Sequence, residues 1–483
     1  MIVTFPTDGI ALDRASGTPL SRQLYTVLRL LIEKGGVPSG NALPSSRVLA
    51  ADLGVGRNTV IAAYDQLSLE GYVTIKRGAA PVVVDLQTGQ AAAHSTHSQP
   101  VGKISARGET MLAQPFHHGE PGQLTFHPGM PDPENFPFSI WSKMLAGRAK
   151  HARRDLFGTY HVCGHPELRE MIRRYLSASR GVTCSADQII VTSGAQAAFD
   201  LLARILLDPG DTVWMEEPGY YGAASAFVSA GAQLSPLRVD ERGWQLDLSP
   251  SQEPRVIYVT PSCHHPLGIT MPLDQRLKLL RMAETTNSWV IEDDYDSEYR
   301  FQGQPIPALQ GISDSRRVIY VSTFAKVLFP AMRLGFMVVP HVIAERIAYA
   351  LSATGQFAPL LTQAALADFI GQGHLVRHLR RMRRLYATRR AYFIQASEEL
   401  LGEWLDVPRT DSGIQLVCRL KGLPDDKAIA REARKVGINL SPLSIQYRHF
   451  PSQQGLVMGF AAVNERVILQ GLTHLRKIFM AHH

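Results

Sequence analysis

The sequence predicts an α/β protein with two domains, and three observations along the chain support this fold class. Residues 104–483 alternate short β-branched runs with helical patterns, which is typical of a mostly parallel sheet covered by helices. Residues 1–84 carry short helical patterns followed by β-rich sequence, which predicts a separate winged helix-turn-helix domain. Residues 85–103 are rich in Ala, Ser, Gln and Gly, so a flexible linker is expected between the two domains.

The composition limits the class of protein. Hydrophobic residues make up 45% of the chain and charged residues 19%, which is ordinary for a globular protein. We expect a cytoplasmic protein with no membrane span, because no stretch reaches the roughly 18 apolar residues that a bilayer requires and no signal peptide is visible. The four cysteines lack the spacing of metal ligands, so neither a metal site nor a disulfide framework is expected.

The first elements of the chain predict a helix-turn-helix. Residues 19–34 carry leucines at helical spacing, and Gly35 ends this helix. Ser45 is placed to cap a short second helix, and a third helix opens at Arg57 after a turn at Gly54. The last of these helices would lie in the major groove with its N-terminal residues at base edges.

Several basic and polar side chains of this domain are candidate contacts to double-stranded DNA. Arginine pairs with guanine, asparagine pairs with adenine, and threonine reaches a phosphate or a thymine methyl group. Residues 72–84 read as a hairpin with basic residues near its tip, which predicts a wing. The candidate contacts are Arg47, Arg57, Asn58, Thr59, Lys76 and Arg77.

The segment LPSSRVLAADLGVGRNTVIAAYDQLSLEGYV, residues 43–73, resembles the GntR-type winged helix. Two departures from that family pattern stand out. Gly56 replaces a usual serine, which is expected to remove one phosphate contact. The wing reads RGAAP instead of RGSGT, which is expected to alter its reach. The resemblance implies sequence-specific binding to an operator.

The strands of the large domain are short β-branched runs. They are expected at residues 188–192, 212–215, 255–259, 288–291 and 317–321. Ligand sites in such sheets lie at the carboxyl ends of the strands. The candidate site residues described next all follow one of these runs.

Lys326 follows the last of these strands in an apolar neighbourhood, and desolvated lysines of this kind are suited to Schiff bases. Arg333 and Thr323 offer a guanidinium and a hydroxyl for a phosphate group. Asp293 follows the strand 288–291, where an aspartate can keep the nitrogen of a pyridine ring protonated.

Three further segments complete the candidate site. Tyr295 could donate a hydrogen bond to a phenolic oxygen of the cofactor, and Tyr220 offers a ring to stack on it. Ala195 and Gln196 open a helix directly after a strand and a glycine turn, where free N–H groups face an anion.

Taken together and in this order, these segments resemble the fold-type I aminotransferases, which use pyridoxal 5′-phosphate (PLP). TSGAQAAFDLLARILLDPGDTVW, EEPGYYGAASAF, IEDDYDSEYRF and STFAKVLFPAMRLGF are similar to the MocR/GabR branch in particular. That resemblance implies Lys326 as the aldimine lysine, Asp293 at the ring nitrogen and Tyr295 at the phenolic oxygen. The residues that it implies around the phosphate are Arg333, Thr323, Ala195 and Gln196.

Two departures from the aminotransferase pattern concern the ligand. His265 stands in the place of an asparagine that contacts the cofactor, and Val457 stands in the place of an arginine that binds the substrate carboxylate. Arg448 is a candidate replacement in binding an effector, and a solvated loop arginine is the alternative interpretation. Either the effector lacks an α-carboxylate or another group binds it.

An arginine-rich segment contributes much of the net charge of +7, which permits binding to nucleic acid. It is interpreted as the exposed face of a helix, with a surface that attracts DNA phosphates as the alternative. Its members are Arg377, Arg380, Arg381, Arg383, Arg384, Arg389 and Arg390.

Three functions are compatible with these features. The first is a homodimeric, PLP-dependent transcriptional regulator that senses a small amine effector through the Lys326 aldimine. The second is an active aminotransferase with a DNA-binding appendage, although the missing carboxylate-binding arginine argues against ordinary amino acids as substrates. The third is a regulator whose large domain no longer binds PLP, which the retention of Lys326, Asp293 and Arg333 argues against.

Overall fold

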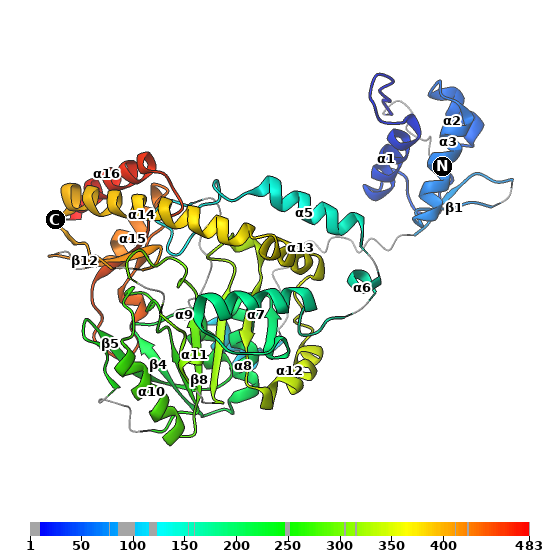
Figure 1. The fold of residues 1–483 in the computed structure, drawn as a ribbon. Coiled ribbons are helices and arrows are strands. Elements are labelled where there is room, and N and C mark those ends of the chain that lie inside the picture. The colour runs from blue at the N-terminus through cyan, green and yellow to red at the C-terminus, as the bar shows by residue number, and fades with distance from the viewer. Residues whose placement is uncertain are drawn as a thin grey trace. The chain divides into compact units, whose positions relative to one another are not determined.

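The chain forms two compact units, Met1–Lys103 and Ile104–His483, which are described separately (Figure 1). The computed structural model describes residues 10–76, 78–85, 102–114, 123–152, 154–158, 160–246, 252–303, 306–313, 316–410, 412–422 and 425–482. Most of the predicted linker and Arg77 therefore lie outside the described residues. Within the described residues, no helix is both long and apolar enough to cross a membrane.

The N-terminal unit is a helix-turn-helix followed by a short hairpin, as predicted. The Ser45 side chain accepts a hydrogen bond from the backbone N–H of Val48, so it caps the second helix. Gly54 takes a φ of 60° in the turn that follows, a conformation that favours glycine. The elements are α1 (Leu20–Glu33), α2 (Ser46–Asp52), α3 (Arg57–Leu69), β1 (Val73–Thr74) and β2 (Val82–Val83).

A single apolar core holds this unit together. Leu28 of α1, Leu49 of α2 and Leu67 of α3 are buried in it, and Val73 and Val83 of the hairpin close one side. The two strands are antiparallel, with Val73 opposite Val83. The N-terminal residues of α3 stay outside this core, which leaves them accessible.

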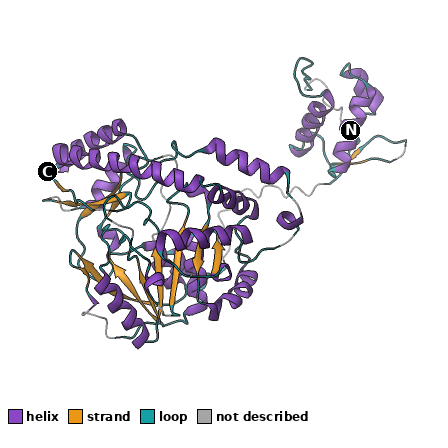
Figure 2. Cartoon of the chain, in the orientation of Figure 1, coloured by secondary structure: helices purple, strands orange, loops and turns teal. Residues whose placement is uncertain are grey.

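The large unit is built on an eight-stranded sheet in the order β3-β10-β9-β8-β7-β4-β5-β6. The strands from β9 to β5 pair in parallel, whereas β10 runs antiparallel to both of its neighbours. The predicted mostly parallel sheet is confirmed, and Figure 2 shows it as the row of orange arrows. Its strands are β3 (Ile189–Thr192), β4 (Thr212–Glu217), β5 (Gln233–Asp240), β6 (Gly243–Trp244), β7 (Val256–Val259), β8 (Trp289–Asp294), β9 (Val318–Thr323) and β10 (Gly335–Val338).

Helices cover both faces of this sheet because successive strand residues point to opposite sides. Ile190 packs with helices α8, α9 and α12, whereas Ile189 and Val191 pack with α7 on the other face. Helix α10 covers β7 and β8. The helices are α4 (Ala106–Leu112), α5 (Phe138–Lys150), α6 (Arg154–Phe157), α7 (Pro166–Arg180), α8 (Ala195–Leu206), α9 (Tyr221–Ser229), α10 (Leu273–Thr285), α11 (Leu309–Ile312), α12 (His341–Thr354) and α13 (Leu360–Gly371).

The C-terminal part of the large unit adds a second, antiparallel sheet in the order β11-β12-β14-β13. Long helices pack beside it, and Figure 1 shows α14 and α16 side by side. These elements are α14 (His374–Leu401), β11 (Leu405–Asp406), β12 (Gln415–Leu420), α15 (Asp426–Lys435), β13 (Ser441–Pro442), β14 (Gly455–Gly459) and α16 (Glu465–His482).

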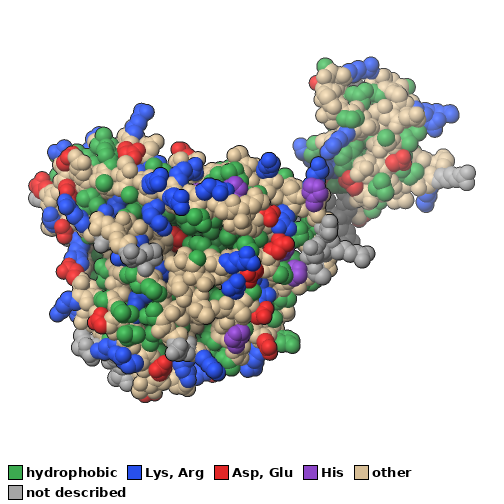
Figure 3. Space-filling view, in the orientation of Figure 1, with side chains coloured by type: hydrophobic (Ala, Val, Ile, Leu, Met, Phe, Trp, Pro, Cys, Tyr) green, Lys and Arg blue, Asp and Glu red, His purple; other side chains and the backbone are tan. Residues whose placement is uncertain are grey.

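The arginine-rich segment lies on α14. Arg377, Arg380, Arg381, Arg383 and Arg384 are exposed, as the interpretation of a solvated helix face requires. Figure 3 shows blue side chains over this helix. For Arg389 the interpretation is wrong, because that side chain is buried and lies 2.7 Å from the Asp132 carboxylate.

Candidate functional site

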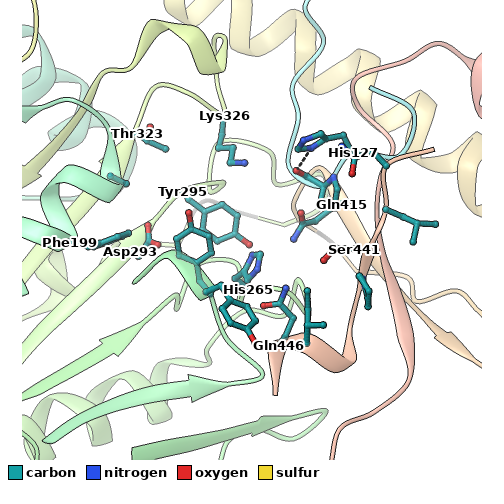
Figure 4. Close-up of a pocket in the computed structure, with 18 of the residues that line it drawn as sticks. His127, Phe199, His265, Asp293, Tyr295, Thr323, Lys326, Gln415, Ser441 and Gln446 are labelled. Carbon is teal, nitrogen blue, oxygen red and sulfur yellow. Dashed lines mark hydrogen bonds between the residues drawn. The ribbon is translucent and has the colours of Figure 1, made fainter. Parts of the chain in front are cut away.

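A cavity of about 340 Å³ lies between the carboxyl ends of the parallel strands and the second sheet. Asp293 and Tyr295 reach it from the end of β8, and Thr323 and Lys326 from the end of β9. Ala195, Tyr220 and His265 follow β3, β4 and β7 and also line it. The large sheet therefore brings together in one cavity seven of the nine residues that the sequence predicted for a cofactor (Figure 4).

Lys326 lies half-buried at the end of the cavity next to β9. Its Nζ donates a hydrogen bond to the carbonyl oxygen of Gly129 over 2.9 Å. Burial lowers the pKa of the Lys326 amine, while the carboxylates of Asp296 and Asp293 oppose that shift. A lowered pKa leaves a larger share of the amine neutral, and only the neutral amine is a nucleophile.

Gly129 is a site residue that the sequence analysis missed. Its φ is 62°, and a Cβ atom at this position would lie 2.6 Å from the Nζ of Lys326. Only glycine leaves room for the lysine in this backbone conformation. The two residues are 197 positions apart, so no local pattern could have indicated the contact.

The Asp293 carboxyl is buried and only half satisfied. Its Oδ2 accepts a hydrogen bond from the Tyr258 hydroxyl over 2.6 Å, whereas its Oδ1 has no partner among the described residues. Burial raises the pKa of Asp293 to about 7, although the hydrogen bond from Tyr258 opposes the shift. A buried carboxyl oxygen without a donor is suited to accept an N–H from a ring nitrogen.

Aromatic side chains surround the middle of the cavity. The His265 ring lies 5.3 Å from the ring of Tyr220 and 5.8 Å from that of Tyr295, edge-on in both cases. Burial, together with the positive charge of Lys326, lowers the pKa of His265 to about 3. The imidazole is therefore neutral at ordinary pH, so it can contact an aromatic ligand without adding charge.

The remaining predicted residues gather at the start of α8. Gly194, which precedes that helix, has a φ of 98°, and a Cβ there would lie 3.6 Å from the Cζ of Arg333. The guanidinium of Arg333 therefore lies beside the N-terminus of α8. The charge of the guanidinium and the positive end of the helix dipole can both stabilise one anion there. Gln196 does not line the cavity, and its Nε2 donates to the carbonyl oxygen of Gly222 over 2.8 Å.

Arg448, the predicted effector contact, is not among the residues that line this cavity. Its guanidinium lies 4.7 Å from the ring centroid of Tyr221, and its side chain is exposed. Val457, in the place of the aminotransferase arginine, packs with Val417 and Leu443 in a small apolar cluster. That cluster carries no charge, so a carboxylate finds no cation there.

The second sheet supplies a wall of the cavity that the sequence analysis missed. Figure 4 shows Gln415 and Ser441 on the opposite side of the cavity from Asp293. Neither residue comes directly after a strand of the parallel sheet, which was the signal that identified the other site residues. Only the packing of the two sheets brings them to the site. Segments beside this sheet add further polar residues, so the polar lining outside the predicted set is His127, Gln415, Arg434, Asn439, Ser441 and Gln446.

In the N-terminal unit, the candidate DNA contacts lie at the starts of α2 and α3. Arg57 and Asn58 are exposed in the first turn of α3, and Thr59 is half-buried beside them. The Nε of Arg57 donates to the Ser46 hydroxyl over 3.3 Å. Arg47 and Lys76 are also exposed.

Comparisons with known proteins agree with this architecture. Residues 133–472 match the family described as aminotransferase class I and II, and residues 20–83 match the bacterial regulatory proteins of the gntR family. The crystal structure of Pyrococcus horikoshii kynurenine aminotransferase, solved in complex with PMP, superposes with a TM-score of 0.68 at 26% identity. That alignment covers 79% of this chain and 95% of the enzyme.

Two regulators align over nearly the whole chain. The probable rhizopine catabolism regulatory protein MocR of Rhizobium meliloti is 46% identical over 473 residues, which cover 98% of this chain and 96% of MocR. The HTH-type pyridoxine biosynthesis transcriptional regulator PdxR of Corynebacterium glutamicum is 32% identical over 464 residues, which cover 94% of this chain and 95% of PdxR.

The fold and the site define a helix-turn-helix transcriptional regulator that carries a domain with the fold of PLP-dependent aminotransferases. Within that class, the chain belongs to the MocR group of GntR-type regulators.

Proposed function

We propose that this regulator binds PLP at Lys326, senses a small primary amine there and binds operator DNA as a homodimer. One observation carries the proposal. The cavity combines a lysine whose pKa is lowered with a buried carboxyl oxygen of Asp293 that lacks a donor. Without a ligand, the unpaired oxygen of Asp293 costs free energy, because buried polar groups without partners destabilise a fold.

The residues present fit PLP at its ring nitrogen and at its phosphate. Asp293 would hold the ring nitrogen, and Tyr220 or His265 offers a ring beside the pyridine. Arg333 and the N-terminus of α8 would hold the phosphate, with Thr323 close by. When bound, PLP supplies an aldehyde carbon that reacts reversibly with primary amines.

The chain's own residues control the proton of Lys326. Burial favours the neutral amine, and the carboxylates of Asp293 and Asp296 limit this effect. The carbonyl of Gly129 gives Nζ an acceptor whenever an effector has displaced the lysine. We propose that this change in the bonding of the Lys326 amine is transmitted to the DNA-binding domain.

The proposal is tested by adding PLP to the purified protein and recording the visible absorbance band of the lysine-bound cofactor. Borohydride reduction is expected to add the mass of the cofactor at Lys326. Lys326→Ala is expected to lose the band and the amine response while it keeps DNA binding. Lys427→Ala, which changes an exposed lysine of α15, is the control. A colourless wild-type protein with no added mass at Lys326 would refute PLP binding.

An active aminotransferase is the second candidate, because Lys326 and Asp293 are both retained in the cavity. The uncharged cluster around Val457 argues against amino acids with an α-carboxylate as substrates. Incubation of the PLP-loaded protein with amines and a keto acid separates the two functions. Repeated turnover indicates an enzyme, whereas a spectral change without turnover indicates a sensor.

A further inference from the structure

The exposed side of α14 carries a continuous basic surface. Four of its arginines follow one another at spacings of i, i+3, i+4 and i+7, which places them on one face of a helix. All four are exposed, and Figure 3 shows blue side chains over this helix. We call this surface the arginine face, and it consists of Arg377, Arg380, Arg381 and Arg384. Since no acidic residue occurs in α14 from His374 to Ser397, the helix itself supplies no counter-charge near this face.

Neighbouring elements do not neutralise the arginine face. Arg377 donates a hydrogen bond to the backbone carbonyl of Gln372 over 2.9 Å, and Arg381 donates one to the backbone carbonyl of Asn135. Both of these acceptors are uncharged. Within the described part of the chain, none of the four arginines forms an ion pair, whereas other exposed arginines of the large unit do. Those paired arginines are Arg174, Arg204, Arg238 and Arg409.

The charges of α14 also oppose the dipole of the helix. Cations stabilise a helix near its C-terminus and anions near its N-terminus. In α14 the order is reversed, because the arginine face begins at Arg377, near the start of the helix, and Glu398 and Glu399 lie in the last turn. Like charges three and four residues apart repel each other as well. The arginine face therefore destabilises its own helix, which indicates that it serves a partner outside the helix.

The chemistry of the arginine face favours a phosphate backbone as that partner. A planar guanidinium binds phosphate through two parallel hydrogen bonds, and all four residues of the face are arginine. From the first to the last of them, the helix axis advances by about 10 Å. The same length of duplex DNA carries about three phosphates on each strand. The face therefore matches a short stretch of backbone in both charge and length.

Duplex DNA also lies within reach of the large unit. In the proposed function the N-terminal unit holds operator DNA, and residues 85–103 link the cores of the two units. A segment of that length spans at most about 65 Å, which corresponds to about 20 base pairs. The DNA that flanks the operator is therefore present at a high effective concentration around the large unit.

We propose that the arginine face of α14 binds the phosphate backbone of the DNA that flanks the operator. This inference rests on the proposed function, because it requires the N-terminal unit to hold the operator. The contact is independent of sequence, since phosphates carry no direct information on the bases. It increases the affinity of the regulator for long DNA and leaves its choice of operator unchanged.

The test uses the full-length protein and two duplexes that contain the same operator, which the protein itself selects from a pool of random sequences. The shorter duplex ends at the last base pair whose replacement weakens binding, and the longer duplex adds about 20 base pairs on each side. Fluorescence anisotropy at several salt concentrations gives a Kd for each duplex. We expect the wild-type protein to bind the longer duplex at least about tenfold more tightly at low salt.

A combined variant neutralises the arginine face, and it carries Arg377→Gln, Arg380→Gln, Arg381→Gln and Arg384→Gln. We expect it to lose the preference for the longer duplex, with a slope of log Kd against log salt that is smaller by about 3 to 4. Its affinity for the shorter duplex is expected to stay unchanged. Its melting temperature is expected to be equal to or higher than that of the wild type, because repulsion within α14 is removed.

A matched control removes the same number of charges from arginines that already have carboxylate partners. It carries Arg174→Gln, Arg204→Gln, Arg238→Gln and Arg409→Gln, and it is expected to keep the preference for the longer duplex. If the neutralised variant does not fold, the comparison of the two duplexes on the wild-type protein still decides the matter.

The outcomes separate this inference from the proposed function. A wild-type protein that selects and binds no DNA refutes the proposed function, and the inference fails with it. Equal affinity of the wild type for both duplexes, or equal losses in the neutralised variant and the control, overturns the inference alone. A neutralised variant that keeps its DNA affinity but sediments as a monomer would assign the arginine face to a second copy of the chain instead.

Discussion

At the scale of single residues, the backbone of Gly129 lies in direct contact with the reactive amine of Lys326. Nζ lies 2.9 Å from the carbonyl oxygen of Gly129, so the lysine is positioned by backbone rather than by another side chain. Such a contact tolerates no Cβ atom on the glycine.

We therefore expect Gly129→Ala to lose the absorbance band of bound PLP, because the added Cβ would lie 2.6 Å from Nζ. The positive φ adds about 1–2 kcal/mol of backbone strain, which must be separated from the steric effect. Gly355→Ala is the matched control, since Gly355 has a φ of 64° with nothing within 4 Å of the added Cβ. Equal loss of the band in both variants would contradict the steric explanation.

Asp293 is the second residue whose environment has a measurable consequence. Its pKa is raised from 3.8 to about 7, mainly by burial. The folded, PLP-free protein thus keeps a proton that the unfolded chain has lost, so the contribution of Asp293 to stability falls as the pH rises through this interval.

Replacing Asp293 by asparagine removes that titration. In the absence of PLP, Asp293→Asn is expected to gain stability relative to the wild type as the pH rises from about 4 to about 8, by on the order of 3 kcal/mol. Urea unfolding at several pH values measures the difference, with Asp274→Asn at an exposed position of α10 as the control. The same variant is expected to bind PLP at least about tenfold more weakly. A stability difference that does not change with pH would refute the raised pKa.

At the scale of elements, a buried carboxylate holds the loop that follows Gln446, a residue that lines the cavity. Oε1 of Glu217 accepts hydrogen bonds from the backbone N–H groups of Arg448, His449 and Phe450 over 3.0, 2.7 and 2.6 Å. Its Oε2 lies 2.9 Å from the Nδ1 of His449. The end of β4 is thereby tied to the loop that follows Gln446.

Glu217→Gln is expected to lower the free energy of unfolding by about 1–3 kcal/mol, because an amide cannot satisfy the same set of donors. It is also expected to weaken effector binding, since Gln446 loses its support. Chemical denaturation and ligand titration measure the two effects, and Glu253→Gln at an exposed position is the control. If Glu217→Gln lowered stability but left the effector affinity unchanged, the hydrogen bonds to Glu217 would stabilise the fold without supporting the effector site.

The first turn of α3 is the element that we expect to read base edges. Arg57 and Asn58 are exposed there, next to the exposed Arg47 of α2. Arg57→Ala and Asn58→Ala are expected to cost about 1–3 kcal/mol in operator binding and to reduce discrimination between sequences.

Arg47→Ala is expected to weaken binding to all sequences alike, as the loss of a phosphate contact would. Binding measured by fluorescence anisotropy on operator and scrambled DNA, at several salt concentrations, distinguishes the two kinds of contact. If Arg57→Ala weakened both DNAs equally, a role in base recognition would be wrong.

At the scale of the whole molecule, two units with separate cores serve separate tasks. The N-terminal core is formed by α1, α2, α3 and the hairpin, and the large unit has cores on both faces of its main sheet. The cavity lies entirely within the large unit, and the candidate base contacts lie entirely within the small one. An amine can influence DNA binding only by favouring one state of the whole protein over another.

Much of this organisation was predictable because it depends on local patterns. The helix-turn-helix follows from the cap at Ser45 and the turn at Gly54, each readable within a few residues. Lys326 and Asp293 were identifiable because each follows a strand, and parallel strands bring their carboxyl ends to one edge. Arg389 was misread because its partner, Asp132, lies 257 positions away.

The sequence by itself determined the class of fold, the two domains and the half of the cavity that would face a cofactor. Only the tertiary structure decided the other half: Gly129 beneath Lys326 and the amides of Gln415, Asn439 and Gln446 across from Asp293. The physical reason is that periodicity, caps and turns act between near neighbours in the chain. Contacts between distant segments instead depend on how whole sheets and helices pack, and no local pattern records that packing.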